Sequence, residues 1–282
     1  MLLNKSLIEQ IKRTFLCFFL AQVLSACTST SEQQSKAKAE ELNEVSIGTI
    51  AGPETEIMEI VKEIALEEHQ LKLNIVTFND FMTPNIALED GSIDANAYQH
   101  LPYLQDAVKA RGFKFASIGQ TFIYPVAAYS QKISACHELS NKARVAIPND
   151  PTNEGRALLL LEKQGLIKLR PEAGLTALPA DIIENPKKLE IIEIEAAQLP
   201  RVLEDVDLAI INTVFAANAN LNPSKDSIFS EGSECPYANI IVVREQDKDK
   251  DWTFKLLKAA NHPKVAEAAT RVFSGNAIPA WN

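Results

Sequence analysis

The stretch VAIPNDPTNEGRALLLL, at residues 145–161, determines how the rest of the chain is interpreted. Its first three residues, 145–147, indicate the end of a short buried strand, which Pro148 stops because proline cannot donate to a ladder. Asp150 and Pro151 indicate the start of a helix. The carboxylate can accept hydrogen bonds from free backbone amides, and proline at the first helical position removes no donor that is needed. The stretch therefore predicts a strand followed by a capped helix.

Arg156 lies one turn into this predicted helix, which would end at Gly165. The helix is apolar nearly all round over residues 157–161, which favours burial. A buried arginine needs an anion, and the N-terminus of a helix favours an anion as well. The pattern thus predicts a site for a ligand carboxylate. The spacing is equally compatible with Arg156 pairing with one of the protein's own acids.

The first 26 residues have the order of an export signal. A basic pair at 12–13 precedes an apolar run at 15–24, which is too short to span a bilayer comfortably. Leu-Ser-Ala directly before Cys27 resembles a bacterial lipobox, in which that cysteine is lipidated and becomes the mature N-terminus. The polar, low-complexity residues 27–43 then predict a flexible tether. We expect a protein anchored by lipid to a membrane of the cell envelope, facing the periplasm or the exterior.

The composition excludes several classes of partner. The formal net charge is −9, which argues against nucleic acid as a partner. The four histidines are dispersed and no Cys-x-x-Cys pair occurs, so we expect no metal site. We also expect no cofactor and no enzymatic activity, because phosphate-loop, glycine-fingerprint and nucleophile-elbow motifs are missing. Cys136 and Cys235 are the candidate thiols of the exported body, and they could form one disulfide or remain two buried thiols.

Strand and helix patterns alternate along the exported body. The expected strands are 45–50, 71–78, 93–98, 113–118, 122–129, 144–147, 189–194, 208–211 and 237–243, and the expected helices are 54–68, 84–88, 101–111, 151–164, 198–203, 252–261 and 263–273. This alternation predicts an α/β fold with mostly parallel sheets flanked by helices. Open sheets of this kind bind ligands at the carboxyl ends of their strands, so we expect two α/β lobes with a ligand between them.

Polar and aromatic residues gather at the ends of these strands. If residues 94–100 are extended, Tyr98 and His100 share one face and lie where the strand ends. Rings around an apolar space suit a polarizable sulfur. Asparagine both donates and accepts hydrogen bonds, as a zwitterionic ligand requires. Taken singly, each residue could instead belong to the core or cap a turn. The candidates from strand ends are Phe81, Tyr98, His100, Tyr124, Asn212 and Asn239.

Seven motifs run through nearly the whole exported body. They are GTIAGPET (48–55), TFNDF (77–81), GSIDANAYQH (91–100), TFIYP (121–125), PNDPTNEGR (148–156), INT (211–213) and PYAN (236–239). Together they resemble the NlpA/MetQ family of methionine-binding lipoproteins, which are the extracytoplasmic subunits of methionine ABC importers. The resemblance implies a two-lobed periplasmic-binding-protein fold of the type II kind, with the ligand in the cleft between the lobes.

The same resemblance implies roles for particular residues. It implies that Arg156 binds the ligand's carboxylate, that Asn149, Asn212 and Asn239 surround its polar end, and that Tyr98, His100, Tyr124 and Phe81 enclose its thioether. The partners of the protein would be methionine, and the permease and ATPase of an ABC transporter. The extended stretches 124–129 and 237–243 are the expected crossings between lobes. The first lobe would therefore hold residues 44–128 and 240–282, and the second lobe residues 129–239.

Two classes of function remain open from the sequence. The first is a solute-binding lipoprotein that captures L-methionine, and possibly D-methionine, for a permease. Another small amino acid or a methionine dipeptide is a variant of this class. The second is a surface lipoprotein that acts through protein contacts, as an adhesin or chaperone. Arg156 and the three asparagines together favour the first class.

Overall fold

The computed structural model describes residues 43–232, 234 and 236–281. The predicted signal segment, Cys27 and nearly all of the predicted tether lie outside these residues, as does Cys235. Cys136 is half-buried, and its pairing with Cys235 stays a prediction. In the part of the chain that the structure describes, no helix is long and apolar enough to cross a membrane.

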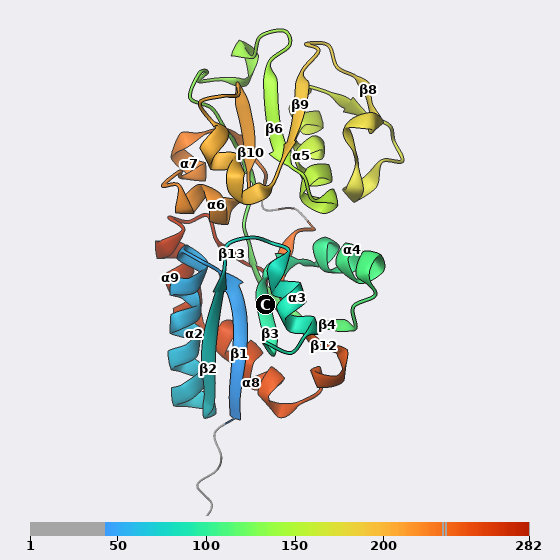
Figure 1. Ribbon diagram of the computed structural model, residues 1–282. Coiled ribbons are helices and arrows are strands. Elements are labelled where there is room, and N and C mark those ends of the chain that lie inside the picture. Colours follow the sequence, from blue (N-terminus) through green and yellow to red (C-terminus); the bar gives the residue numbers. More distant parts are fainter. Residues whose placement is uncertain (1–42, 233, 235, 282) are drawn as a thin grey trace, which may run out of the picture. The chain divides into compact units, whose positions relative to one another are not determined.

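The first lobe is built on a mixed six-stranded sheet, in the lower part of Figure 1. In spatial order its strands are β13 (Ile278–Pro279), β4 (Phe115–Ile123), β12 (Ala238–Arg244), β3 (Ala95–His100), β1 (Asn43–Ile50) and β2 (Leu71–Phe78). Helices α2 (Pro53–His69), α8 (Asp251–Ala260) and α9 (Pro263–Val272) pack with one face, and α3 (Thr83–Glu89) and α4 (Leu101–Arg111) with the other. Strand β12 shows why both faces are covered. Ile241 and Val243 belong to one buried cluster, and Ile240 and Val242 to the other.

The second lobe is built on a five-stranded sheet, in the upper part of Figure 1. Its strands, in spatial order, are β11 (Ser227–Ser230), β5 (Ala127–Tyr129), β10 (Leu208–Ile211), β6 (Arg144–Pro148) and β9 (Glu190–Ile194). Helix α5 (Pro151–Lys163) covers one face, and the 3-10 helix η4 (Ala196–Val202) with α6 (Thr213–Asn218) covers the other. Val145 and Ile147 face α5, whereas Ala146 faces η4, so this short strand is apolar throughout because it is buried on both sides.

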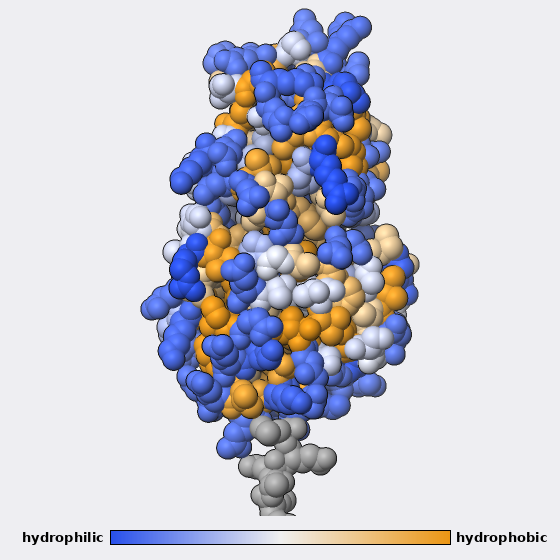
Figure 2. Space-filling model, turned by 60° about the vertical axis from the view of Figure 1, so that its left-hand side comes forward, coloured by the Kyte–Doolittle hydropathy of each residue, from blue (hydrophilic) through white to orange (hydrophobic). Residues whose placement is uncertain are grey.

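Smaller elements complete the second lobe and the edges of the first. They are the paired strands β7 (Lys168–Leu169) and β8 (Ile182–Glu184), the helix α7 (Pro223–Asp226), and the 3-10 turns η1 (Cys136–Glu138), η2 (Gly174–Thr176), η3 (Pro179–Asp181) and η5 (Glu245–Asp247). On the face of the molecule in Figure 2, hydrophilic residues are interspersed with apolar ones.

The ladders are mixed, whereas the sequence predicted mostly parallel sheets. Strand β1 is parallel to β2 and β3, and β6 is parallel to β9 and β10. Strands β5 and β12 form antiparallel ladders with their neighbours, because each follows a crossing between lobes and enters its sheet in the opposite direction. The ladders β13–β4 and β7–β8 are antiparallel as well. Strand β12 returns from the second lobe and lies antiparallel between β3 and β4.

The crossings differ slightly from those expected. The connection 124–126 leads into β5, so Ala127 and Ala128 pair with the second sheet rather than ending the first lobe. After β11 the chain returns to the first sheet in β12, which begins at Ala238. The sequence predicted one strand over 122–129, but Pro125 lies in the break between β4 and β5.

The start of helix α5 follows the sequence prediction. Asp150 is the N-cap, and its carboxylate accepts a hydrogen bond of 3.0 Å from the backbone N–H of Asn153. One turn later, Gly155 allows the loop containing η2 to approach the helix. A Cβ at this position would lie 2.4 Å from the carbonyl oxygen of Leu175. The close approach therefore requires glycine.

We expect Gly155→Ala to lower the free energy of unfolding by about 1–3 kcal/mol, because the added methyl would collide with backbone atoms. Denaturant unfolding of the two proteins measures this difference. Gly232→Ala is the matched control, since a Cβ there meets no atom closer than 3.9 Å. Equal stability of wild type and Gly155→Ala would show that the η2 loop moves away at no cost.

Candidate functional site

A cavity between the two sheets, with about 410 Å³ of space that includes open solvent at its mouth, is the site candidate. The first lobe contributes the start of α2, the end of β3 and the connection after β4, and the second lobe contributes the first turns of α5 and α6. The lining residues are Glu54, Phe81, Tyr98, Gln99, His100, Tyr103, Tyr124, Asn153, Arg156, Asn212, Thr213, Val214 and Asn239.

Seven of the eight residues expected from the sequence line this cavity, and Asn149 does not. Asn149 instead lines an outer hollow together with Tyr103 and Asp150. It lies in the bend between β6 and the N-cap, before the helix begins. Asn153, one turn into α5, lines the cavity where Asn149 was expected.

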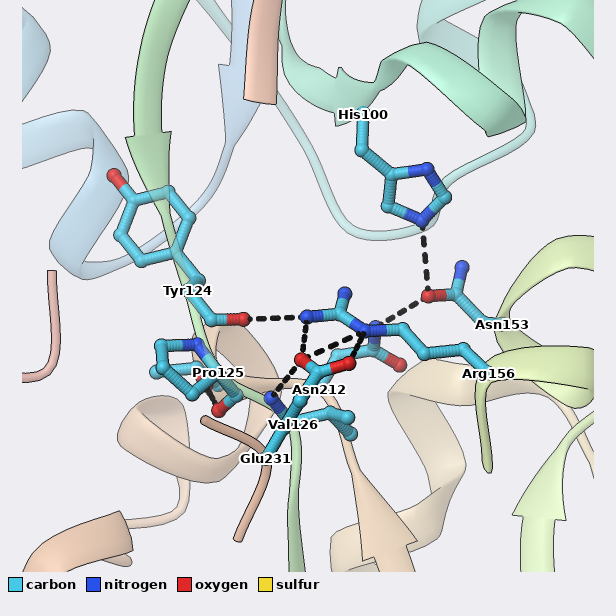
Figure 3. A network of polar contacts seen from close by, with 9 residues as sticks. His100, Tyr124, Pro125, Val126, Asn153, Arg156, Asn212 and Glu231 are labelled. Atoms are coloured by element: carbon cyan, nitrogen blue, oxygen red, sulfur yellow. Dashed lines mark hydrogen bonds and ion pairs between the residues drawn. The ribbon is translucent and has the colours of Figure 1, made fainter. Parts of the chain in front are cut away.

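Arg156 is buried, with 4% of its surface exposed, and is paired with an acid of the same chain (Figure 3). Its Nε donates to both carboxylate oxygens of Glu231, at 3.1 Å each, and its Nη2 donates to the same carboxylate. Nη2 also donates to the carbonyl oxygen of Tyr124 at 3.0 Å. The ring of Tyr237 lies below the guanidinium, with its centroid 4.3 Å from Cζ. Of the two possibilities left open for Arg156, pairing with the protein's own acid is therefore present.

The third guanidinium nitrogen, Nη1, remains available for a ligand. It donates to none of the residues that the structure describes, and Figure 3 shows it on the side away from Glu231. Two N–H donors of a permanently charged group are thus held in place next to the cavity. Because Glu231 and the Tyr124 carbonyl fix the other edge of the guanidinium, the arginine is pre-organised to bind an anion.

Asn153 joins the two lobes through its side-chain oxygen. This oxygen accepts a hydrogen bond of 2.8 Å from Nδ2 of Asn212, and it lies 3.3 Å from Nε2 of His100 (Figure 3). The backbone N–H of Tyr103 donates to Nδ1 of His100, so the ring proton is on Nε2, which donates to Asn153. Burial, with the positive charge of Arg156 as a second cause, lowers the pKa of His100 to about 3. The imidazole is therefore neutral at physiological pH.

The other end of the cavity is aromatic. The ring centroid of Phe81 lies 6.0 Å from that of Tyr98, 6.3 Å from that of Tyr103 and 4.8 Å from that of Phe215. The Tyr103 hydroxyl donates to the carbonyl oxygen of Phe81 at 2.8 Å, which fixes the loop after β2. Burial raises the pKa of Tyr98 well above its ordinary value, so this wall is uncharged. It suits an apolar or thioether side chain.

Oδ1 of Asn212 and Oε2 of Glu54 are buried acceptors at the cavity that lack a hydrogen-bond partner among the described residues. Nδ2 of Asn239, by contrast, donates to the carbonyl oxygen of Tyr98 at 3.1 Å. Neither Asn212 nor Asn239 uses its side chain to cap a helix or turn, so the alternative raised for them in the sequence does not occur. Unpaired buried acceptors are costly and indicate a donor that comes from a ligand.

Among the residues of this arrangement that were not expected from the sequence are Glu54, Asn153 and Glu231. Glu54 directly follows the Gly-Pro turn at the end of β1, which is a signal for a strand-end site. Asn153 lies within the decisive stretch but was not singled out. Glu231 lies 75 residues from Arg156 and carries no local signal.

Comparison with known proteins gives one consistent picture. Residues 45–281 match the model of a family described as NlpA lipoprotein. A relative from Vibrio cholerae, described as a probable D-methionine-binding lipoprotein MetQ, is 52% identical over 244 residues, covering 86% of this chain and 91% of the relative.

Two solved structures are similar over almost their full length. One is a periplasmic substrate-binding protein of an ABC transporter from Coxiella burnetii, with TM-score 0.82 and 52% identity, covering 84% of this chain and 100% of the other. The second is a nutrient-binding protein from Burkholderia cenocepacia bound to methionine, with TM-score 0.83 and 48% identity, covering 84% and 100%. The two-lobed binding-protein fold expected from the sequence is therefore confirmed.

Removing the partner of Arg156 should destabilise the protein. We expect Glu231→Ala to lower the free energy of unfolding by about 3 kcal/mol, because it leaves a buried guanidinium without its counter-charge. Denaturant unfolding of ligand-free protein measures the change. Glu234→Ala, at an exposed acid of the same segment, should change stability by less than about 0.5 kcal/mol. Similar values for the two variants would mean that the ion pair contributes no net stability.

Proposed function

The chain belongs to the NlpA lipoprotein family, and from this premise we propose that it is a lipid-anchored, extracytoplasmic solute-binding protein that captures methionine for an ABC transporter. The observation that carries the proposal is the polarity of the cavity between the lobes. A fixed arginine and asparagine side chains lie at one end, and uncharged aromatic rings lie at the other. The relatives are described as binding proteins, and we propose binding without a chemical step.

The arrangement matches a zwitterionic amino acid with an apolar, sulfur-containing side chain. Nη1 of Arg156 would donate to the ligand's carboxylate, and Asn239 and Asn212 would complete the polar end. Phe81, Tyr98, His100 and Tyr124 would surround the thioether, because sulfur contacts aromatic rings favourably. The neutral state of His100 is consistent with this, since an imidazolium beside a thioether would be desolvated without an anion.

Capture by two lobes also explains why the lining comes from both sheets. A ligand that contacts residues of both lobes binds the closed arrangement more tightly than an open one, and it therefore shifts the population toward closure. The predicted lipid on Cys27 and the tether would hold the binding unit close to the membrane. There it would pass methionine to the permease of a transporter driven by an ATPase.

Arg156→Lys should bind methionine about 30-fold more weakly than the wild type, because lysine keeps the charge but loses the planar set of donors that contacts Glu231 and a ligand together. Isothermal titration calorimetry with L- and D-methionine, on protein freed of bound solute by partial unfolding and refolding, gives the affinities.

The exposed Arg271→Lys is the matched control and should bind as the wild type does. A wild type that binds neither enantiomer would overturn the proposed function. A loss of threefold or less in Arg156→Lys would show that Arg156 acts only within the ion pair.

Cys27→Ser should release the protein from membranes without changing its affinity for methionine, since a single lipidated residue followed by a tether lies outside the binding unit. Fractionation of cells labelled with a radioactive fatty acid measures both lipid incorporation and membrane association. Membrane association that persists without lipid incorporation would mean that the segment before Cys27 remains as an uncleaved anchor.

A further inference from the structure

Glu54 is the only acid among the residues that line the cavity. It lies in the first turn of α2 and is 94% shielded from solvent, since 6% of its surface is exposed. Its Oε2 has no hydrogen-bond partner in the described part of the chain. The other acid close by, Glu231, is fully engaged, since it accepts from Arg156 and from the backbone N–H of Val126. The cavity thus holds a buried carboxyl group of which one oxygen, Oε2, has no partner among the described residues.

The turn that presents Glu54 is fixed by both lobes. Gly52 has φ +111°, and a Cβ on it would lie 1.8 Å from Oδ1 of Asn218 in the second lobe. The side chain of Asn218 donates to the carbonyl oxygen of Ala51 at 2.8 Å. On the lobe's own side, the Thr55 hydroxyl donates to the carbonyl oxygen of Ile50 at 3.1 Å. Glu54 is therefore held at the cavity when the two lobes are together.

We propose that Glu54 receives the ligand's ammonium group and loses its own proton as the ligand binds. This inference rests on the proposed function and adds the requirement that the ligand carries an α-amino group. Burial raises the pKa of Glu54 to about 8, against the opposing effect of the Ile50 backbone N–H, so the empty site holds a neutral carboxylic acid at pH 7. An ammonium beside Oε2 favours the carboxylate, because a nearby opposite charge stabilises the charged form.

The exchange balances in protons and charge. The ligand's ammonium keeps its three N–H bonds, the O–H bond of Glu54 breaks, and the proton leaves to the solvent. The carboxylate and the ammonium then form an ion pair, and Asn212 Oδ1 is a second acceptor available to the same ammonium. The ligand's carboxylate pairs with Arg156. Both charges of a zwitterion are therefore matched, which a neutral Glu54 would not achieve.

The other ionisable groups that face the cavity do not titrate near neutral pH. The pKa of His100 is lowered to about 3, that of Tyr103 is raised, and those of Tyr98 and Tyr124 are raised well above the ordinary value. Below pH 8 binding must expel a proton, so affinity should rise about tenfold for each unit of pH up to 8. Above that it should level off and then fall as the ligand's own ammonium loses its proton.

One further acid titrates in the same range outside the cavity. The pKa of Glu154 is raised to about 8, first by burial and then by Glu193. Glu154 does not line the cavity. Glu154→Gln therefore serves as a control, and it should leave both the affinity and the proton exchange on binding unchanged.

The test is titration calorimetry of the full-length wild type with L-methionine at pH 7, in buffers of low and high ionisation enthalpy. The dependence of the heat on the buffer counts the protons released. We expect about 0.9 proton, the protonated fraction of a group with pKa 8 at pH 7. Glu54→Gln should release none and bind at least tenfold more weakly, and the exposed Glu56→Gln, on the same turn, should behave as the wild type.

A second ligand checks the role of the amino group. 4-(Methylthio)butanoate is methionine without its amine, and the wild type should bind it at least 30-fold more weakly than methionine. In Glu54→Gln the affinities for the two ligands should differ by only a few fold. If Glu54→Gln does not fold, the number of protons that the wild type releases on binding methionine and the pH dependence of its affinity test the proposal by themselves.

The outcomes separate the two proposals. Methionine binding with no proton release, or an undiminished difference in affinity between the two ligands in Glu54→Gln, overturns the role of Glu54 and leaves the proposed function standing. A wild type that does not bind methionine overturns both.

Discussion

The buried ion pair between Arg156 and Glu231 fixes the point at which the two lobes meet. Arg156 belongs to α5 of the second lobe, the Tyr124 carbonyl belongs to the first crossing, and Glu231 lies at the start of the second crossing. Glu231 also accepts from the backbone N–H of Val126 in the first crossing. The guanidinium of Arg156 thus links both connections between the lobes to helix α5. The cavity lies directly beside these contacts, so the geometry of its anion-binding end depends on the ion pair between Arg156 and Glu231.

Local chemistry made much of the fold predictable. Strand β2, helix α4 and strand β10 begin and end where the sequence placed them, and the cap of α5 follows from Asp150 and Pro151. Other elements differ from the prediction. The strand expected over 122–129 is divided between β4 and β5, with Pro125, which cannot donate to a ladder, between them. The helix expected near 198–203 belongs to the 3-10 helix η4, which contains Pro200.

The site was predictable to the extent that strand ends and helix starts define it. Seven expected residues line the cavity because the carboxyl end of β3, the connection after β4 and the first turns of α5 and α6 meet there. Asn149 was expected from the family resemblance, but it precedes the N-cap of α5, whereas Asn153, one turn into the helix, lines the cavity. Glu54 does follow the Gly-Pro turn at the end of β1, but its burial, like that of Glu231, depends on residues distant in the sequence.

The path of the chain between the sheets also sets an order of folding. All five strands of the second sheet lie within residues 127–230, so that lobe is complete in one continuous segment. The first sheet needs β12 between β3 and β4, and its core needs α8 and α9. A chain that emerges N-terminus first can therefore complete the second lobe while the first lobe still lacks its central strand β12. The unpaired edges of β3 and β4 are then open to wrong strand pairing until residue 244 has emerged.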